Sequence, residues 1–200
     1  IDGHIAVGDE AQLMPLGNQC RVRNLQVHGR DVSAVYAGQR AAVNLAGIKK
    51  ESISRGDVLC RTDSMQPSLM LDVKLQNLPD SKRIIESGSR LHIYHGAAVR
   101  LAKAVLLDRD ALRPGESCYA QLRLSEALAA RQGDRFVARF YSPLETIGGG
   151  IILDDAPARH KRNDAAVLSA LAVRENGSGA ERVLQALTAF DLSLIHISEP

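Results

Sequence analysis

The sequence contains no tryptophan, few aromatic residues and only three cysteines. Aromatic residues make up 4% of the 200 residues, so we expect a core built from Val, Leu, Ile and Ala. Cys20, Cys60 and Cys118 are odd in number and far apart, and they form neither a CxxC pair nor a metal-type spacing. We interpret them as free thiols in a reducing cytoplasm, and we expect no metal site built on them.

Long apolar runs and a strong charge imbalance are also absent. No run approaches the roughly 18 apolar residues that a membrane helix needs, and no signal peptide is recognised. The net charge of +2 is too small to indicate nucleic acid by itself, so any RNA contact has to come from local clustering of the 25 lysines and arginines. We therefore expect a cytoplasmic protein with no membrane partner.

Residues 1–65 have the pattern of a small β-barrel. Glu10 to Met14 is predicted to be a strand that lies between turns containing glycine. The next strand begins at Cys20, and its alternation slips by one position at Asn24, as it does at a β-bulge. Arg40 to Ala46 is a third predicted strand, and several short strands at this spacing favour a barrel.

A second β-pattern with longer strands follows a polar stretch, Thr62 to Ser68, that we interpret as a linker. Leu69, Leu71, Val73 and Leu75 alternate with polar residues, which indicates a strand with one buried face. Further strands are predicted at 91–94, 99–107, 120–124, 136–140 and 147–153. We expect a second barrel at 69–154.

Two features of this second barrel could be read as ligand sites. Gly148, Gly149 and Gly150 resemble a phosphate cradle, but a strand follows them in place of GK[ST]. A tight turn or a close approach of two backbones is the favoured interpretation. His92 and His95 lie three residues apart in a strand and point to opposite faces, so we predict no metal site there.

The composition changes after the second barrel. A basic linker, 155–162, contains the run Arg159-His160-Lys161-Arg162. Helical periodicity begins after Asn163 or Asp164, breaks at 176–179 and then resumes, which predicts the start of a winged-helix domain at 163–190. Two short helices cannot bury their apolar stripes without the rest of such a domain, so we expect this segment to be frayed.

Ordered motifs in the first barrel carry a resemblance to a known family. They are Gln26-Val27-His28-Gly29, Gly38-Gln39-Arg40 and Arg55-Gly56-Asp57. The set resembles the second domain of translational GTPases, and the first two motifs resemble the selenocysteine-specific elongation factors, the SelB family, in particular. The second barrel adds motifs in the order of that family's third domain, among them Leu91-His92-Ile93-Tyr94-His95-Gly96 and Arg113-Pro114-Gly115-Glu116. The resemblance covers about residues 1–190.

The resemblance implies a mainly β fold: two small β-barrels of the domain II and domain III type, followed by an α-helical winged-helix start. It also implies a GTP-dependent factor that delivers selenocysteinyl-tRNA to the ribosome and reads a selenoprotein mRNA hairpin through C-terminal domains that are mostly missing here. GTP and Mg²⁺ belong to the family's G domain. We therefore expect no cofactor and no activity of its own in this piece, which would supply aminoacyl and tRNA binding.

Arg40 is the leading candidate for a functional residue. A selenol is far more acidic than a thiol, so the selenocysteine side chain is an anion at neutral pH, and a fixed cation in a pocket can select it. The resemblance places an arginine of the aminoacyl pocket at Arg40, and His28 is a candidate for the same pocket. A surface arginine and a structural histidine are the alternatives. The candidates for tRNA contact are Arg109, Arg113, Arg123, Arg131, Arg135 and Arg139.

The sequence departs from the family in three ways. The G domain that precedes the barrels is absent, as are the first strands of the second domain. Leu192 to Pro200 alternates like a strand and resembles a translated sequencing adapter, so we expect it to be non-native, the alternative being a strand of the wing. A rival function is that of another translational GTPase, a general elongation or initiation factor. A hydrolase or metal enzyme using His92, His95 and Cys118 has no nucleophile–base motif behind it.

We predict that this chain does not bind GTP, because no GxxxxGK[ST] phosphate loop exists in the sequence to hold the β- and γ-phosphates. Titration of the chain into a fluorescent GTP analogue should show no saturable change in anisotropy. Saturable binding at micromolar concentration would contradict the prediction.

Overall fold

In the computed structural model, residues 3–189 are described, and the chain forms two units. Within the described residues, the first comprises 3–69 with 95–99 and 126–130, and the second comprises 70–94, 100–125 and 131–189. The expected non-native tail, 192–200, lies outside the described residues.

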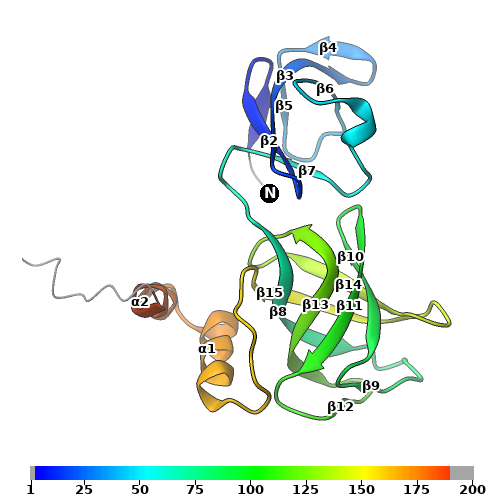
Figure 1. The fold of residues 1–200 in the computed structure, drawn as a ribbon, viewed down its shortest axis with the longest axis vertical. Helices are drawn as coiled ribbons and strands as arrows, with labels where there is room; N and C mark the ends of the chain where they lie inside the picture. The colour runs from blue at the N-terminus through cyan, green and yellow to red at the C-terminus, as the bar shows by residue number, and fades with distance from the viewer. Residues whose placement is uncertain (1–2, 190–200) are drawn as a thin grey trace, which may run out of the picture. The chain divides into compact units, whose positions relative to one another are not determined.

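The first unit is built from short strands joined by tight turns (Figure 1). Its main sheet has the order β4-β3-β2-β7, with β6 also pairing with β3, and β1 pairs separately with β5. Among the described residues these ladders do not close on themselves. The β3–β6 register shifts between Val22 and Asn24, which confirms the predicted bulge. The elements are β1 (His4–Ala6), β2 (Glu10–Met14), β3 (Asn18–Val27), β4 (Arg30–Val32), β5 (Ala34–Tyr36), β6 (Ala42–Ala46), η1 (Lys50–Ser52) and β7 (Val58–Cys60).

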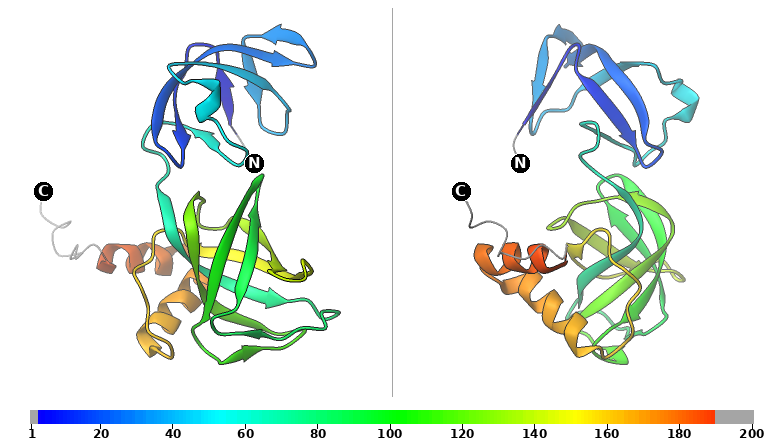
Figure 2. Two further views of the ribbon diagram at one scale, coloured as in Figure 1. Left: turned by 45° about the vertical axis from the view of Figure 1, so that its right-hand side comes forward. Right: turned by 60° about the vertical axis from the view of Figure 1, so that its left-hand side comes forward.

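The second unit contains a closed six-stranded barrel with the order β10-β11-β13-β8-β15-β14 (Figure 2). The alternating side chains Leu71, Val73 and Leu75 of β8 are fully buried inside it, as their spacing predicts. The mainly β fold class is therefore confirmed. The elements are β8 (Pro67–Asn77), β9 (Ile85–Glu86), β10 (Arg90–His95), β11 (Ala98–Leu106), β12 (Ala111–Leu112), β13 (Ser117–Ala129), β14 (Arg135–Phe140) and β15 (Thr146–Asp154).

The three consecutive glycines lie in β15, where neighbouring backbones approach closely. A Cβ atom at Gly148 or Gly150 would overlap a carbonyl oxygen of β8, that of Gln76 or of Lys74. A Cβ atom at Gly149 would overlap the carbonyl oxygen of Phe136 on β14. The predicted close backbone approach is confirmed, and these glycines let β15 fit between its two neighbours.

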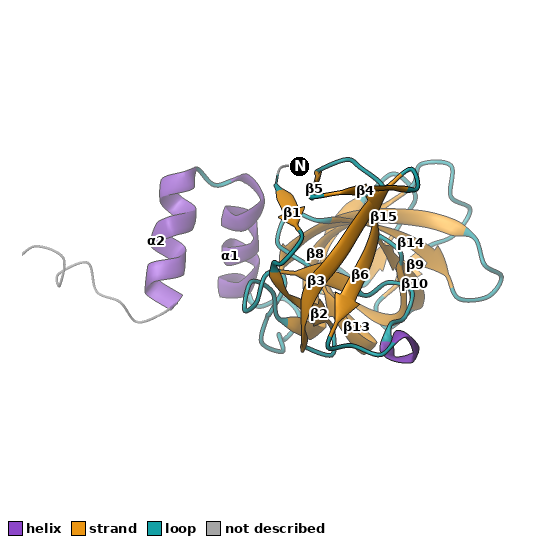
Figure 3. Cartoon of the chain, turned by 90° about the horizontal axis from the view of Figure 1, so that it is seen from above, coloured by secondary structure: helices purple, strands orange, loops and turns teal. Residues whose placement is uncertain are grey.

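Two helices follow the barrel, α1 (Ala165–Asn176) and α2 (Gly179–Ala189). Of the two predicted cap candidates, Asn163 and Asp164, Asp164 caps α1, because its Oδ1 accepts hydrogen bonds from the backbone N–H groups of Ala166 (3.1 Å) and Val167 (3.3 Å). In Figure 3, α1 lies between the β-structure and α2. No helix in residues 3–189 is long and apolar enough to cross a membrane.

The expectation that both helices fray does not describe α1. Leu171 is 2% exposed and packs on Val105, Leu107 and Leu153, which belong to the barrel and its adjoining loop. The outer surface of the barrel thus supplies the apolar partner that the helix lacks within its own segment. On α2, by contrast, Val183 is 60% exposed. The winged-helix assignment itself stays a prediction.

We predict that Gly150→Ala destabilises the barrel by about 1–3 kcal/mol, because the new methyl group overlaps the Lys74 carbonyl and β15 has to shift. Gly179→Ala is the matched control, since a Cβ atom at Gly179 meets nothing within 4 Å. Denaturant unfolding of the two variants gives the comparison. If Gly150→Ala and Gly179→Ala have equal free energies of unfolding, then β15 can shift away from β8 without loss of stability, and the prediction is wrong.

Candidate functional site

His28 lies in the tight turn that joins β3 to β4. Val27 pairs with Arg30, so His28 and Gly29 form a two-residue loop, and both have positive φ angles, 52° and 75°. These are the angles of a type I′ hairpin turn, which explains the glycine at the second position. The His28 side chain is exposed.

Arg40 follows a second turn, which is closed by Tyr36 and Gln39. The backbone N–H of Gln39 donates to the carbonyl of Tyr36 (3.1 Å), and the Gln39 side-chain oxygen accepts from the backbone N–H of Tyr36 (2.8 Å). Gly38 has φ of 88° between them. Arg40 is exposed and has no ion-pair partner among residues 3–189.

The two predicted pocket residues lie at the same end of one ladder. The last pair of β3 and β6 is Gln26 with Ala42. His28 follows Gln26 by two residues, and Arg40 precedes Ala42 by two residues, so both lie beyond this end of the ladder. Gln26 and Asn24 on β3 also donate to Asp31 Oδ1 on β4, both at 2.9 Å. These two hydrogen bonds lower the pKa of the Asp31 carboxyl group. The site is thus a polar, solvent-exposed sheet end, and an enclosed pocket around Arg40 stays a prediction.

A cavity of about 720 Å³ also lies in the first unit, and neither Arg40 nor His28 lines it. It is bordered by β1, β5, the start of β2 and the end of β7. His4 and Tyr36 contribute rings whose centroids lie 6.0 Å apart. Asp9, Glu10 and Arg61 add charged groups to its wall.

The six arginines proposed for tRNA contact are distributed over β13, β14 and the turns before and after β13. Arg109 and Arg113 precede β13, whereas Arg131 follows it, and the 13 residues of this strand span about 40 Å. Arg109 is paired with Asp108 (3.3 Å) and Glu116 (3.5 Å). Arg113, Arg131 and Arg135 are exposed, and Arg123 is half-buried.

Arg139 belongs to a group of outward-facing aromatic and basic side chains on β10 and β14. Its guanidinium lies 5.7 Å from the centroid of the Tyr94 ring, and its NH2 group donates to the carbonyl of Leu144 (3.2 Å). Nearby, His92 stacks on Tyr141 with 5.4 Å between ring centroids. His92 is therefore engaged in an aromatic contact.

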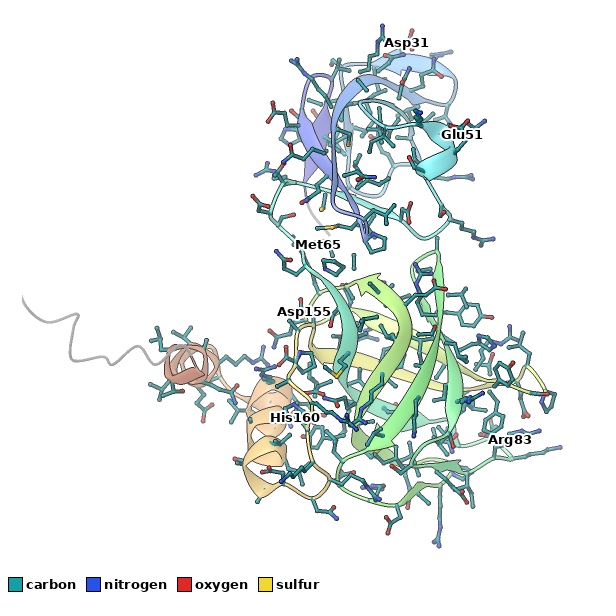
Figure 4. The ribbon with its side chains drawn as sticks, viewed as in Figure 1. Asp31, Glu51, Met65, Arg83, Asp155 and His160 are labelled. Atoms are coloured by element: carbon teal, nitrogen blue, oxygen red, sulfur yellow. The ribbon has the colours of Figure 1, made fainter. Side chains whose placement is uncertain are left out.

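The basic linker 155–162, which we call the strap, is bound to the outer surface of the barrel. His160, labelled in Figure 4, lies between α1 and the barrel, and its Nε2 is 2.7 Å from Oδ2 of the buried Asp72. Gln121 Nε2 donates to Asp72 Oδ1 (3.0 Å) and to the carbonyl of Ala158 (2.9 Å). Arg162 Nε donates to the carbonyl of Leu106 (3.0 Å). Alternate strap residues thus hold it to the barrel, while Arg159 and Lys161 are exposed.

Ion pairs between the barrel and α1 continue this attachment. Arg174 pairs with Asp154 of β15, and Glu175 accepts from Lys74 Nζ (3.1 Å) and from Tyr119 Oη (2.6 Å). Lys74 Nζ also lies 4.3 Å from the centroid of the Tyr119 ring. Burial and the Glu175 carboxylate together raise the pKa of the Tyr119 phenol to about 12.

Sequence reasoning missed the roles of Asp72, Gln121 and His160. Asp72 and Gln121 occupy outward-facing strand positions, where a polar residue is usually solvated, and His160 lies in a run that looks like a linker. The one available signal was the alternation within the strap, in which residues 160 and 162 share a face.

Comparison with known families supports the assignment of both units. The family described as "Selenocysteine-specific elongation factor, beta-barrel domain" matches residues 72–159. The family described as "Elongation factor Tu domain 2" matches residues 1–60.

Curated relatives carry the same name. The chain is 37% identical over 173 residues to the selenocysteine-specific elongation factor of Desulfomicrobium baculatum, covering 86% of this chain and 27% of that protein. It is 30% identical over 164 residues to that of Escherichia coli strain K12, covering 81% of this chain and 25% of that protein. The chain thus spans about a quarter of the length of these relatives.

A solved structure shares the fold. The crystal structure of the bacterial selenocysteine-specific elongation factor EF-Sec superposes with a TM-score of 0.73 at 23% identity, over 92% of this chain and 28% of that one. The family match over the second barrel, the curated relatives and this shared fold confirm the resemblance.

We predict that Tyr119→Phe loosens α1 from the barrel and lowers the free energy of unfolding by about 1 kcal/mol, because Glu175 loses a hydrogen-bond donor. The folded-state pKa of about 12 lies above the ordinary value of 10.0, so this stabilisation is complete below pH 10 and disappears as the pH rises through 12. Hydrogen exchange at the α1 amides and denaturant unfolding measure the effect.

Tyr36→Phe is the control, because Tyr36 is 63% exposed and its hydroxyl group has no hydrogen bond within residues 3–189. Unchanged α1 protection in Tyr119→Phe would mean that the hydroxyl does not hold the helix.

Proposed function

We propose that this chain is the aminoacyl- and tRNA-binding part of a selenocysteine-specific elongation factor, the kind of protein that its curated relatives are named for. The match of residues 72–159 to the barrel domain of these factors is the observation that carries the proposal. The full-length factor would deliver selenocysteinyl-tRNA to the ribosome in a GTP-dependent way. Such work takes place in the cytoplasm, where ribosomes translate.

Arg40 would distinguish the selenolate from the hydroxyl group of serine. Its guanidinium is always charged and has no carboxylate partner among the described residues, so it is available to an anionic ligand. Because Arg40 is exposed, the attraction becomes strong only where a bound aminoacyl end or a neighbouring domain excludes water from it. We propose that His28, which lies at the same end of the β3–β6 ladder, contacts the same ligand.

The arginines of the second barrel would contribute phosphate contacts to the tRNA. Arg113 and Arg135 are exposed and available for this role, and Arg131 is also exposed, whereas Arg109 is engaged with Asp108 and Glu116. Recognition of a selenoprotein mRNA hairpin would belong to domains that follow the start represented by α1 and α2.

The test is Arg40→Ala in the full-length factor. Binding of selenocysteinyl-tRNA should weaken by about 1–3 kcal/mol, the range for loss of a charge-assisted contact, and binding of seryl-tRNA should change much less. Arg30→Ala is the matched control, because Arg30 is an exposed arginine on the neighbouring strand β4. Fluorescence titration of wild type and the two variants with each tRNA gives the six dissociation constants.

Equal losses for the two tRNAs would make Arg40 a general contact and would favour another translational GTPase. The match of residues 1–60 to the second domain of elongation factor Tu is the observation that supports this alternative function.

A further inference from the structure

Two cations face each other on the outer surface of the second unit's barrel. Lys103 of β11 is directly opposite Arg123 of β13 in the antiparallel register. Their chain neighbours Ala102, Ala104, Leu122 and Leu124 are buried, so both side chains point outward. Side chains in opposite positions are close neighbours, and like charges there repel each other and destabilise the sheet.

The strap adds a third cation to this pair. Gln121, two residues before Arg123 on the same face of β13, donates to the carbonyl of Ala158 (2.9 Å) and so brings the strap alongside. The next strap residue, Arg159, is exposed, and its positive charge, after the larger effect of burial, lowers the pKa of Arg123. Lys103, Arg123 and Arg159 therefore gather where two strands and the strap meet.

None of these three cations has a carboxylate partner within residues 3–189. The neighbouring acidic groups are already engaged: Asp72 binds His160 and Gln121, and Asp154 pairs with Arg174. Three cations that are close together and uncompensated are attractive to an anion, because a bound anion removes their mutual repulsion as well as gaining its own attraction.

We propose that Lys103, Arg123 and Arg159 form a binding site for backbone phosphates of RNA. The proposal rests on the proposed function, and it adds Lys103 and Arg159 to the arginines considered from the sequence. Arginine suits this ligand because its planar guanidinium donates two parallel hydrogen bonds to a phosphate, and three cations spread over two strands and the strap match successive phosphates better than a single ion.

Gln121 positions this site. It accepts a hydrogen bond from Arg123 Nε (3.3 Å) through Oε1, and its amide nitrogen holds both Asp72 and the strap carbonyl. One side chain therefore orients Arg123 and places Arg159 next to it. The site is complete only while the strap is bound to the barrel, so phosphate binding and strap attachment stabilise each other.

The experiment measures the affinity of the whole chain for a fluorescently labelled RNA duplex that carries no amino acid, across a range of salt concentrations. Lys103→Ala and Arg159→Ala should each weaken binding about threefold to tenfold at low salt and reduce the slope of log affinity against log salt by about one. The same two variants should unfold at equal or higher denaturant concentration than wild type, because each removes a repulsion. Loss of stability would instead indicate a structural role.

Lys82→Ala is the matched control, since Lys82 is an exposed cation of the same unit and the next residue, Arg83, pairs with Glu145 (2.9 Å) and lies away from His160 in Figure 4. A control that weakens binding as much as the site variants would show a net-charge effect and overturn the proposal. Inorganic phosphate should compete only weakly at matched ionic strength, because the duplex presents several linked phosphates and a free ion presents one, and strong competition would identify a free-phosphate site instead. If wild type binds the duplex and every variant binds it with the same affinity, only this inference is wrong. If wild type binds no RNA, the proposed function is wrong as well.

Discussion

The second unit depends on one buried carboxylate, that of Asp72. It is 1% exposed, and its burial raises the pKa of its carboxyl group, an effect that the attraction of His160 and the hydrogen bonds from Gln121 and His160 only partly offset. A buried charge without such donors costs several kcal/mol. The Asp72 carboxylate is therefore tolerated on the outer side of the barrel only because the strap covers it. The strap contributes the imidazole of His160, and β13 contributes the side-chain amide of Gln121.

The strap in turn sets the position at which α1 begins. Its end is held by the Asn163 N–H, which donates to the carbonyl of Leu107 (2.7 Å), and the next residue, Asp164, caps α1. The helix then begins where Leu171 can reach the apolar surface of the barrel. The residues that bind the barrel alternate with the exposed Arg159 and Lys161, so the geometry that secures the strap also presents its cations.

Sequence reasoning succeeded where the determinants are local. The alternation of Leu71, Val73 and Leu75, the slip at Asn24 and the Asp164 cap all lie within a few residues of the structure they specify, and each was correctly predicted. It failed for the strap and α1, because Asp72 and His160 are 88 residues apart and neither has an unusual neighbourhood in the sequence. A run of four basic residues reads as a solvated linker unless the acidic partner across the barrel is known.

The candidate aminoacyl site shows a different limit. The turn chemistry of His28-Gly29 and Gly38-Gln39 can be read from the sequence, and the register then shows that His28 and Arg40 lie beyond the same end of the β3–β6 ladder. What no local pattern supplies is the low dielectric that would make Arg40 selective, because its side chain is exposed in the chain as it stands. An exposed guanidinium attracts an anion only weakly in water. Under the proposed function, selectivity for the selenolate would arise only when another surface, that of the tRNA end or of a neighbouring domain, closes over Arg40 and excludes water from it.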